Sequence, residues 1–128
     1  MKHNQRTQMK RSAIGRVLLR HFPRLPFRGF LLRLVTKTEG GEPFSLTLRE
    51  VLRVYFRVEV GEFSYGSLLV PGRADQFTTI GRYASIGPGV RRIGAAHPLS
   101  DLSLHPFWYN SRFGFVENED VERSSCLI

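Results

Sequence analysis

The residues of this chain that are best suited to do chemistry gather in "HPLSDLSLHPFWYN", residues 97–110. Two histidines in this stretch, His97 and His105, each precede a proline. An imidazole with an ordinary pKa of about 6.5 is mostly neutral at pH 7, so it can accept a proton from an attacking group. Such a base needs a carboxylate or a carbonyl on its other ring nitrogen, and Asp101 is the candidate carboxylate. The alternative interpretation of each histidine is an ordinary surface residue of a loop.

Metal and disulfide chemistry have little support in the sequence. No His, Cys, Asp and Glu residues are clustered with the spacing of metal ligands, so we expect no metal site. The single cysteine, Cys126, rules out an internal disulfide framework and suits a reducing cytoplasm, which is the expected location. We interpret Cys126 as a plain small residue.

A six-residue repeat is the main clue to the fold. "TTIGRY", 78–83, aligns with "ASIGPG", 84–89, and each places Ile-Gly after two small residues. Short strands separated by tight corners give this spacing, with Ile in the interior and Gly at the corner. Stacked strands of this kind form a parallel β-helix, with further corners expected at 60–61 and 93–94. The spacing also fits a small antiparallel sheet with glycine turns, so both interpretations stay open.

Two short amphipathic helices are predicted near the N-terminus. The first has its apolar residues at Ile14, Val17 and Leu18. The apolar residues of the second are Phe27, Phe30, Leu31, Leu34 and Val35. The composition of "EGGEP", 39–43, is typical of a linker. We therefore expect a basic N-terminal arm over 1–43 and the main domain over 44–128.

A third helix is predicted over 48–57. Thr47 and Glu50 have the spacing of a capping box, which would start it. Its buried stripe is expected to consist of Leu48, Val51, Leu52, Tyr55 and Phe56. The opposite face would carry Arg49, Arg53 and Arg57.

The basic residues are concentrated in the arm. Residues 1–38 hold ten Lys and Arg and no acid, whereas residues 39–128 hold nine Arg and eleven Asp and Glu. One interpretation places 1–38 on an anionic membrane surface, and another treats it as a solvated or targeting extension. Nucleic acid is not an expected partner because the arm has no known nucleic-acid motif. No apolar run approaches the roughly 18 residues of a membrane span.

Three separated stretches together resemble a known family: "FSLTLREVLRVYFRVEVGEFSYG", "IGRYASIGPGV" and "HPLSDLSLHPFWYN". They resemble, in the same order, the left-handed β-helix hexapeptide-repeat acyltransferases, and most closely the branch of xenobiotic and serine-acetyltransferase-like enzymes. The resemblance covers about residues 44–116. It implies a mainly β fold, in which a partial left-handed parallel β-helix of few coils follows N-terminal amphipathic helices.

The resemblance also implies an activity. Members of the family move an acetyl or other acyl group from acetyl-coenzyme A to a hydroxyl or amine, usually as homotrimers, and use no metal. The acceptor is a small molecule such as a sugar, a serine or an antibiotic. A loop histidine acts as the general base, and the motif match makes that residue His97.

The remaining site residues follow less directly from the resemblance. Tyr65, Ser100, Asp101, His105 and Trp108 are expected to bind substrate. Asp101 is in doubt as the residue that orients His97, because relatives often carry the acid one place earlier, where this chain has Ser100. His105 also fits a structural role, and Trp108 a core or trimer contact.

No coenzyme A-binding residue is assigned. Arg91 and Arg92 could pair with a phosphate of the coenzyme, but a solvated edge is the better explanation of them.

The resemblance implies further Ile-Gly hexapeptides after the histidine loop, and "VENEDVERSSCLI" ends at Ile128, where the next coil is expected. We therefore expect either a fragment of a longer acyltransferase or a short form without most of the coenzyme A groove. An isolated monomer would expose strand edges and is expected to aggregate. The alternative function is a catalytically inactive β-helix remnant that binds a partner or a membrane surface.

Overall fold

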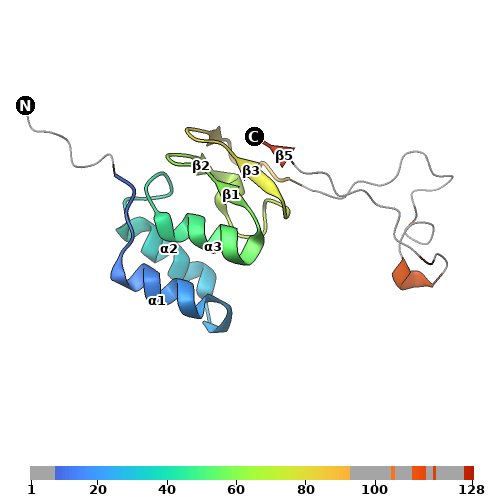
Figure 1. Cartoon of the computed structure of the whole chain (residues 1–128), viewed down its shortest axis with the longest axis horizontal. Helices are drawn as coiled ribbons and strands as arrows, with labels where there is room; N and C mark the ends of the chain where they lie inside the picture. The colour runs from blue at the N-terminus through green and yellow to red at the C-terminus, as the bar shows by residue number, and fades with distance from the viewer. Residues whose placement is uncertain (1–7, 93–104, 106–110, 115–116, 118–125) are drawn as a thin grey trace, which may run out of the picture.

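The computed structural model of the chain describes residues 8–92, 105, 111–114, 117 and 126–128 (Figure 1). Within these residues the helices are α1 (Ala13–His21), α2 (Arg28–Thr38) and α3 (Leu46–Phe56), with 3-10 turns η2 (Phe22–Arg24), η3 (Ser67–Leu69) and η5 (Ser111–Phe113). The strands are only two or three residues long: β1 (Glu59–Val60), β2 (Tyr65–Gly66), β3 (Thr78–Ile80), β4 (Ser85–Ile86) and β5 (Cys126–Leu127).

Helix α3 lies at the centre of the fold. Helices α1 and α2 pack against it, and β1 contacts it as well (Figure 1). Side chains from the helices and from the stacked strands share one core, whose buried members include Leu18, Phe22, Leu32, Val35, Leu48, Val51, Leu52, Val58, Leu68, Leu69 and Ile80. Residues from both sides of the expected boundary at 43–44 therefore contribute to the same core.

Both predicted N-terminal helices are confirmed as α1 and α2. Ser12 caps α1, because its hydroxyl accepts a hydrogen bond from the Gly15 amide. Helix α2 begins one residue later than its apolar pattern indicates. Phe27, which precedes it, has left-handed backbone angles (φ 51°, ψ 30°) that cannot continue a right-handed helix.

The third helix is also present, but the predicted capping box is wrong. Helix α3 begins at Leu46, and the hydroxyl of Ser45 accepts from the Leu48 amide at 3.1 Å. Thr47 donates its hydroxyl proton to Glu39 instead of capping the helix. Glu50 forms ion pairs with arginines and makes no contribution to the cap. The predicted buried stripe is confirmed, with its first members fully buried.

The strands after α3 pair in parallel in two stacks. Glu59 of β1 pairs with Thr79 of β3, and Tyr65 of β2 pairs with Ser85 of β4, each 20 residues further along the chain. Strand β5 then pairs in parallel with β3, which gives the order β1-β3-β5. Parallel pairing throughout the described residues contradicts the small antiparallel sheet. The left-handed β-helix itself stays a prediction.

Residues with left-handed backbone angles mark the corners between the strands at six-residue steps. Arg57 (φ 54°) and Phe63 (φ 61°) lie six residues apart, and so do Phe77 (φ 65°), Tyr83 (φ 58°) and Gly89 (φ 79°). The six-residue period in the sequence is therefore a period of backbone corners. It recurs in both stretches of chain that form the paired strands.

The glycines of the Ile-Gly pairs do not act as corners, contrary to the prediction. Gly61 and Gly81 have no positive φ. A Cβ atom on Gly61 would lie 2.6 Å from the main-chain nitrogen of Arg82 and 2.6 Å from the carbonyl carbon of Gly81. Gly61 is therefore required because two backbones pass too close together for any side chain.

Candidate functional site

Four of the predicted site residues, His97, Ser100, Asp101 and Trp108, lie outside the described residues. Their mutual arrangement and the role of His97 as a base therefore stay predictions. Of the other predicted site residues, His105 is exposed.

Tyr65 is the predicted site residue that the structure places within the stacked strands. It lies in β2, and its amide donates a hydrogen bond to the carbonyl of Ala84 at 3.0 Å. Its side chain is 46% exposed. The main chain of Tyr65 is thus fixed by the neighbouring strand, while its side chain is accessible to a ligand.

The described residues on either side of the segment that contains the histidine stretch are bonded to the rest of the fold. At its start, the Arg92 amide donates to the carbonyl of Arg73, and the Asp75 amide donates to the carbonyl of Arg92, both at 3.1 Å. At its end, Cys126 pairs with Thr78 in the third parallel strand. Arg92 and Cys126, which flank this segment in the sequence, are therefore both bonded within the described fold.

Arg92 is engaged within the fold. Its guanidinium lies 3.9 Å from the carboxylate of Asp75, and its side chain is only 10% exposed. The idea that Arg92 binds a phosphate of coenzyme A has no support in this position. Arg91 is exposed.

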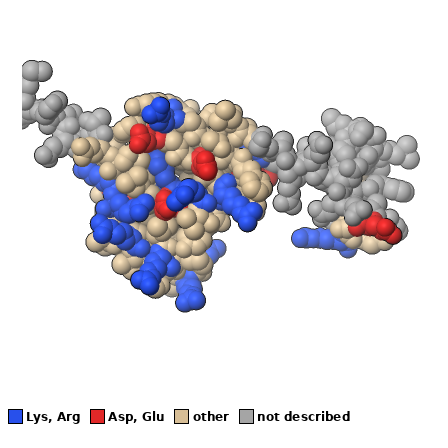
Figure 2. Space-filling model, in the orientation of Figure 1, with Lys and Arg blue, Asp and Glu red and all other residues tan. Residues whose placement is uncertain are grey.

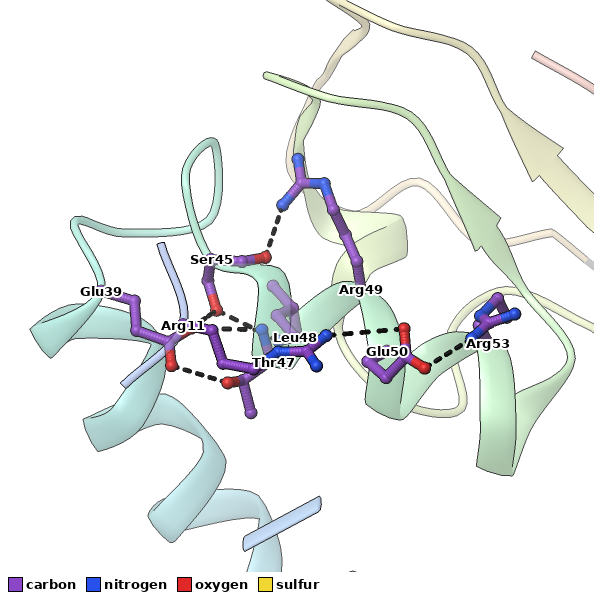
Figure 3. A network of polar contacts seen from close by, with 8 residues as sticks. All are labelled: Arg11, Glu39, Ser45, Thr47, Leu48, Arg49, Glu50 and Arg53. Carbon is purple, nitrogen blue, oxygen red and sulfur yellow. Dashed lines mark hydrogen bonds and ion pairs between the residues drawn. The ribbon is translucent and has the colours of Figure 1, made fainter. Parts of the chain in front are cut away.

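The most highly connected polar group among the described residues is the carboxylate of Glu39, whose residue is 1% exposed. It accepts from the amide and hydroxyl of Ser12 at 2.8 and 2.9 Å. It also accepts from the Ser45 hydroxyl at 2.7 Å, and from the Thr47 hydroxyl and amide at 2.6 and 3.2 Å (Figure 3). This carboxylate joins the end of α2 to the starts of α1 and α3. Residues 39–43 connect the two helices, and Glu39 within them is buried.

Hydrogen bonding determines the direction in which the pKa of Glu39 shifts. Burial by itself raises the pKa, but the hydrogen bonds from Thr47, Ser12 and Ser45 together outweigh it and hold the pKa below the ordinary value of 4.5. The carboxylate is therefore ionised at neutral pH, and its charge is balanced by donors at two helix N-termini. With every oxygen occupied by these donors, its role is structural.

The folded protein is expected to lose stability in acid through Glu39. A carboxylate with a lowered pKa in the folded state contributes its full stability above its unfolded pKa, near 4.5, and loses it as the pH falls through the folded value. Urea unfolding between about pH 7 and about pH 3 measures this loss. We expect Glu39→Gln to reduce stability at pH 7 by about 2–3 kcal/mol and to flatten the decrease in acid. An unchanged pH dependence in the variant would contradict this assignment.

The same cluster explains why α1 needs a glycine at position 15. A Cβ atom there would collide with the Thr47 hydroxyl and lie 2.5 Å from the Glu39 carboxylate. We expect Gly15→Ala to lower the free energy of unfolding by about 1–3 kcal/mol. Gly29→Ala in α2 is the matched control, because nothing lies within 4 Å of its added methyl group. It is expected to be neutral or to stabilise by up to about 1 kcal/mol, and equal effects of the two variants in urea unfolding would contradict the account.

Arg49 connects the helices to the stacked strands. Its guanidinium donates to the carbonyls of Glu42 (2.6 Å), Ser45 (2.9 Å), Gly61 (3.1 Å) and Ser64 (2.9 Å). The residue is 8% exposed, so the prediction that it lies on the outer face of α3 is wrong. Burial lowers the pKa of Arg49, and the carboxylates of Glu62 and Glu42 oppose this shift. Arg49 thus fixes the first corner of the stack against α3.

Two hollows are candidates for ligand sites. One, of about 720 Å³, lies between α2 and residues 69–71 and has Leu32, Leu48 and Leu69 among its lining. The other, of about 750 Å³, lies between α3 and the β1 and β3 strands and has Arg49, Glu59 and Ile80 among its lining. Tyr65 lines neither hollow. No group of three or more possible metal ligands occurs within the described residues.

Comparison of the chain with protein-family models, with curated proteins and with solved structures finds no match. Within the described part of the chain, no helix is both long enough and apolar enough to cross a membrane.

Sequence reasoning missed the two groups that hold the helices and strands together. Glu39 follows a helical pattern and precedes two glycines, so its composition resembles a linker. Ser12, Ser45 and Thr47 are residue types that are favoured at helix starts. Their hydroxyl groups all donate hydrogen bonds, and this was the available signal for a shared acceptor such as Glu39. The helical spacing of Arg49 predicted a position on the outer face of α3. Nothing in the sequence reveals the four carbonyl groups to which its guanidinium donates.

Proposed function

We propose that this chain is a left-handed β-helix acyltransferase that carries the family's histidine loop. The enzyme moves an acetyl or other acyl group from acyl-coenzyme A to a hydroxyl or amine of a small acceptor, such as a sugar, a serine or an antibiotic-like molecule. His97 is the general base. Tyr65, exposed on β2, is one of the described residues that the proposal places beside the acceptor.

One observation carries the proposal: short parallel strands stack with corners at six-residue steps, and residues 97–110 lie in the sequence between two of these strands, β4 and β5. A six-residue corner period is the architecture expected from the resemblance. Arg92, before this segment, is bonded to Arg73 and Asp75, and Cys126, after it, pairs with β3. A base on such an insertion would be held by a rigid scaffold, as acid–base catalysis requires.

The chemistry needs a proton acceptor at the attacking atom. Coenzyme A supplies the acyl group as a thioester. His97, in its neutral form, takes the proton from the acceptor oxygen or nitrogen as that atom forms its bond to the acyl carbon. The bond from carbon to sulfur breaks, and His97 returns a proton to the departing sulfur. The histidine ends in its starting protonation state, and the reaction consumes no metal or oxidant.

The experiment that tests the proposal is product analysis with a panel of acceptors. The protein is incubated with acetyl-coenzyme A and separately with sugars, serine and aminoglycoside-like amines, and the products are identified by mass spectrometry. We expect one acceptor class to gain an acetyl group in a protein-dependent manner. The absence of product from every acceptor, with protein shown to be folded, would contradict the proposal and favour the non-catalytic role.

A further inference from the structure

Helix α2 has two apolar faces, and the described residues cover only one of them. Its inner face is buried through Leu32 and Val35. Phe27, Phe30 and Leu34 recur at i, i+3 and i+7 and so form a stripe on the opposite side. Their exposed fractions are 84%, 63% and 46%. Three large apolar side chains in one row on a surface indicate an interaction site.

Positive charge surrounds this outer stripe. Helix α2 carries Arg28, Arg33 and Lys37, and residues 1–38 contain no acidic side chain. Figure 2 shows Lys and Arg side chains spread over the helical part of the visible face. Arg33 and Lys37 also line the apolar hollow beside α2, together with Phe30. The stripe is thus an apolar row within a basic surface. A surface that matches it would have an apolar layer beneath a layer of negative charges.

We propose that the outer stripe of α2, Phe27, Phe30 and Leu34, docks this protein on an anionic lipid surface. The aromatic and leucine side chains enter the boundary between headgroups and acyl chains, while Arg33 and Lys37 contact the lipid phosphates. Phe27 suits this role because its left-handed backbone at the start of α2 places it in the turn after Pro26, where it is almost fully exposed. The attachment is peripheral and reversible, and it requires no acyl transfer.

Vesicle co-sedimentation of the full chain tests this proposal. The probes are vesicles of phosphatidylcholine alone and of phosphatidylcholine mixed with phosphatidylglycerol. We expect binding to the anionic vesicles and weakening by salt. A double variant, Phe30→Ser with Leu34→Ser, should lower the partition coefficient by on the order of tenfold or more. Arg33→Gln with Lys37→Gln should lower it by on the order of tenfold.

Val54→Ser is the matched control, because Val54 is 52% exposed on α3, away from the stripe. It should bind anionic vesicles as the unchanged protein does, and circular dichroism verifies that all variants are folded. Equal binding to neutral and anionic vesicles, or binding that persists in both double variants, would overturn the proposal. Concentration-dependent self-association that is lost in the Phe30→Ser, Leu34→Ser variant, without vesicle binding, would also overturn it and assign the stripe to a second copy. Neither result depends on the acyltransferase assignment.

Discussion

Replacing His97 with Ala is expected to lower kcat for acyl transfer about 10²- to 10⁴-fold, which is the usual contribution of a general base. The acceptor hydroxyl or amine then attacks the thioester without a group to take its proton. The binding of acetyl-coenzyme A should change little, because the base acts on the acceptor. The measurement is the initial rate of acetyl transfer to the acceptor identified from the panel, together with acetyl-coenzyme A affinity by calorimetry.

His105→Ala is the paired control for this prediction. His105 also precedes a proline in the same stretch, but we interpret it as a substrate-lining or structural residue. It should affect KM more than kcat and retain kcat within about tenfold of the unchanged protein. A large loss of kcat in the His105 variant, with a normal rate in the His97 variant, would assign the base to His105 and contradict the motif match.

Replacing Gly66 with Ala is expected to have the largest effect on stability, about 3–5 kcal/mol, which is enough to unfold a small domain. Gly66 has φ 125° and ψ −167°, a conformation that is nearly exclusive to glycine. Its Cβ atom would also collide with the carbonyl oxygen of Ile86 and lie 2.8 Å from its carbonyl carbon. Because Ile86 belongs to the neighbouring strand, the variant must separate β2 from β4. Urea unfolding followed by circular dichroism measures the loss.

Gly72→Ala separates the backbone strain from the collision. Gly72 also has a positive φ, 85°, but nothing lies within 4 Å of an added Cβ atom. Its substitution should therefore cost only the strain of a left-handed alanine, about 1–2 kcal/mol. If Gly66→Ala is no more damaging than Gly72→Ala, the close approach of β2 and β4 is wrong.

The helices and the repeat could be predicted from the sequence because their signals are local. Apolar spacing at i, i+3 and i+4 located α1, α2 and the buried stripe of α3. The six-residue period correctly indicated short strands with corners, although Phe77 and Tyr83 form the corners where glycine was expected. Local spacing cannot distinguish parallel from antiparallel pairing, because that depends on which residues meet at long range. Parallel pairing was therefore one of two open interpretations, and only the strand register decides it.

The site was less accessible to prediction from the sequence. The resemblance assigned roles to His97, Ser100, Asp101 and Trp108, and these assignments stay predictions. The polar groups that join the helices to the strands depend on partners far apart in the sequence. Glu39 contacts Ser12 across 27 residues, and Arg49 contacts Ser64 across 15. Neither pairing produces a periodic signal in the sequence. The composition around Glu39 therefore indicated a linker, and the helical spacing of Arg49 indicated a solvent-exposed side chain.

The acyltransferase proposal depends on the stack of parallel strands, because the histidine stretch lies in the sequence between two of its strands, β4 and β5. Nuclear magnetic resonance of the isotope-labelled 14.7 kDa chain tests this stack directly through cross-strand proton contacts. The account predicts contacts of parallel type between residues 59–60 and 79–80, and between residues 78–79 and 126–127. Close contacts between α-protons across the pairs, which are typical of antiparallel strands, would contradict the account. So would the absence of any contact between 78–79 and 126–127, because the histidine loop would then not be anchored at its second end.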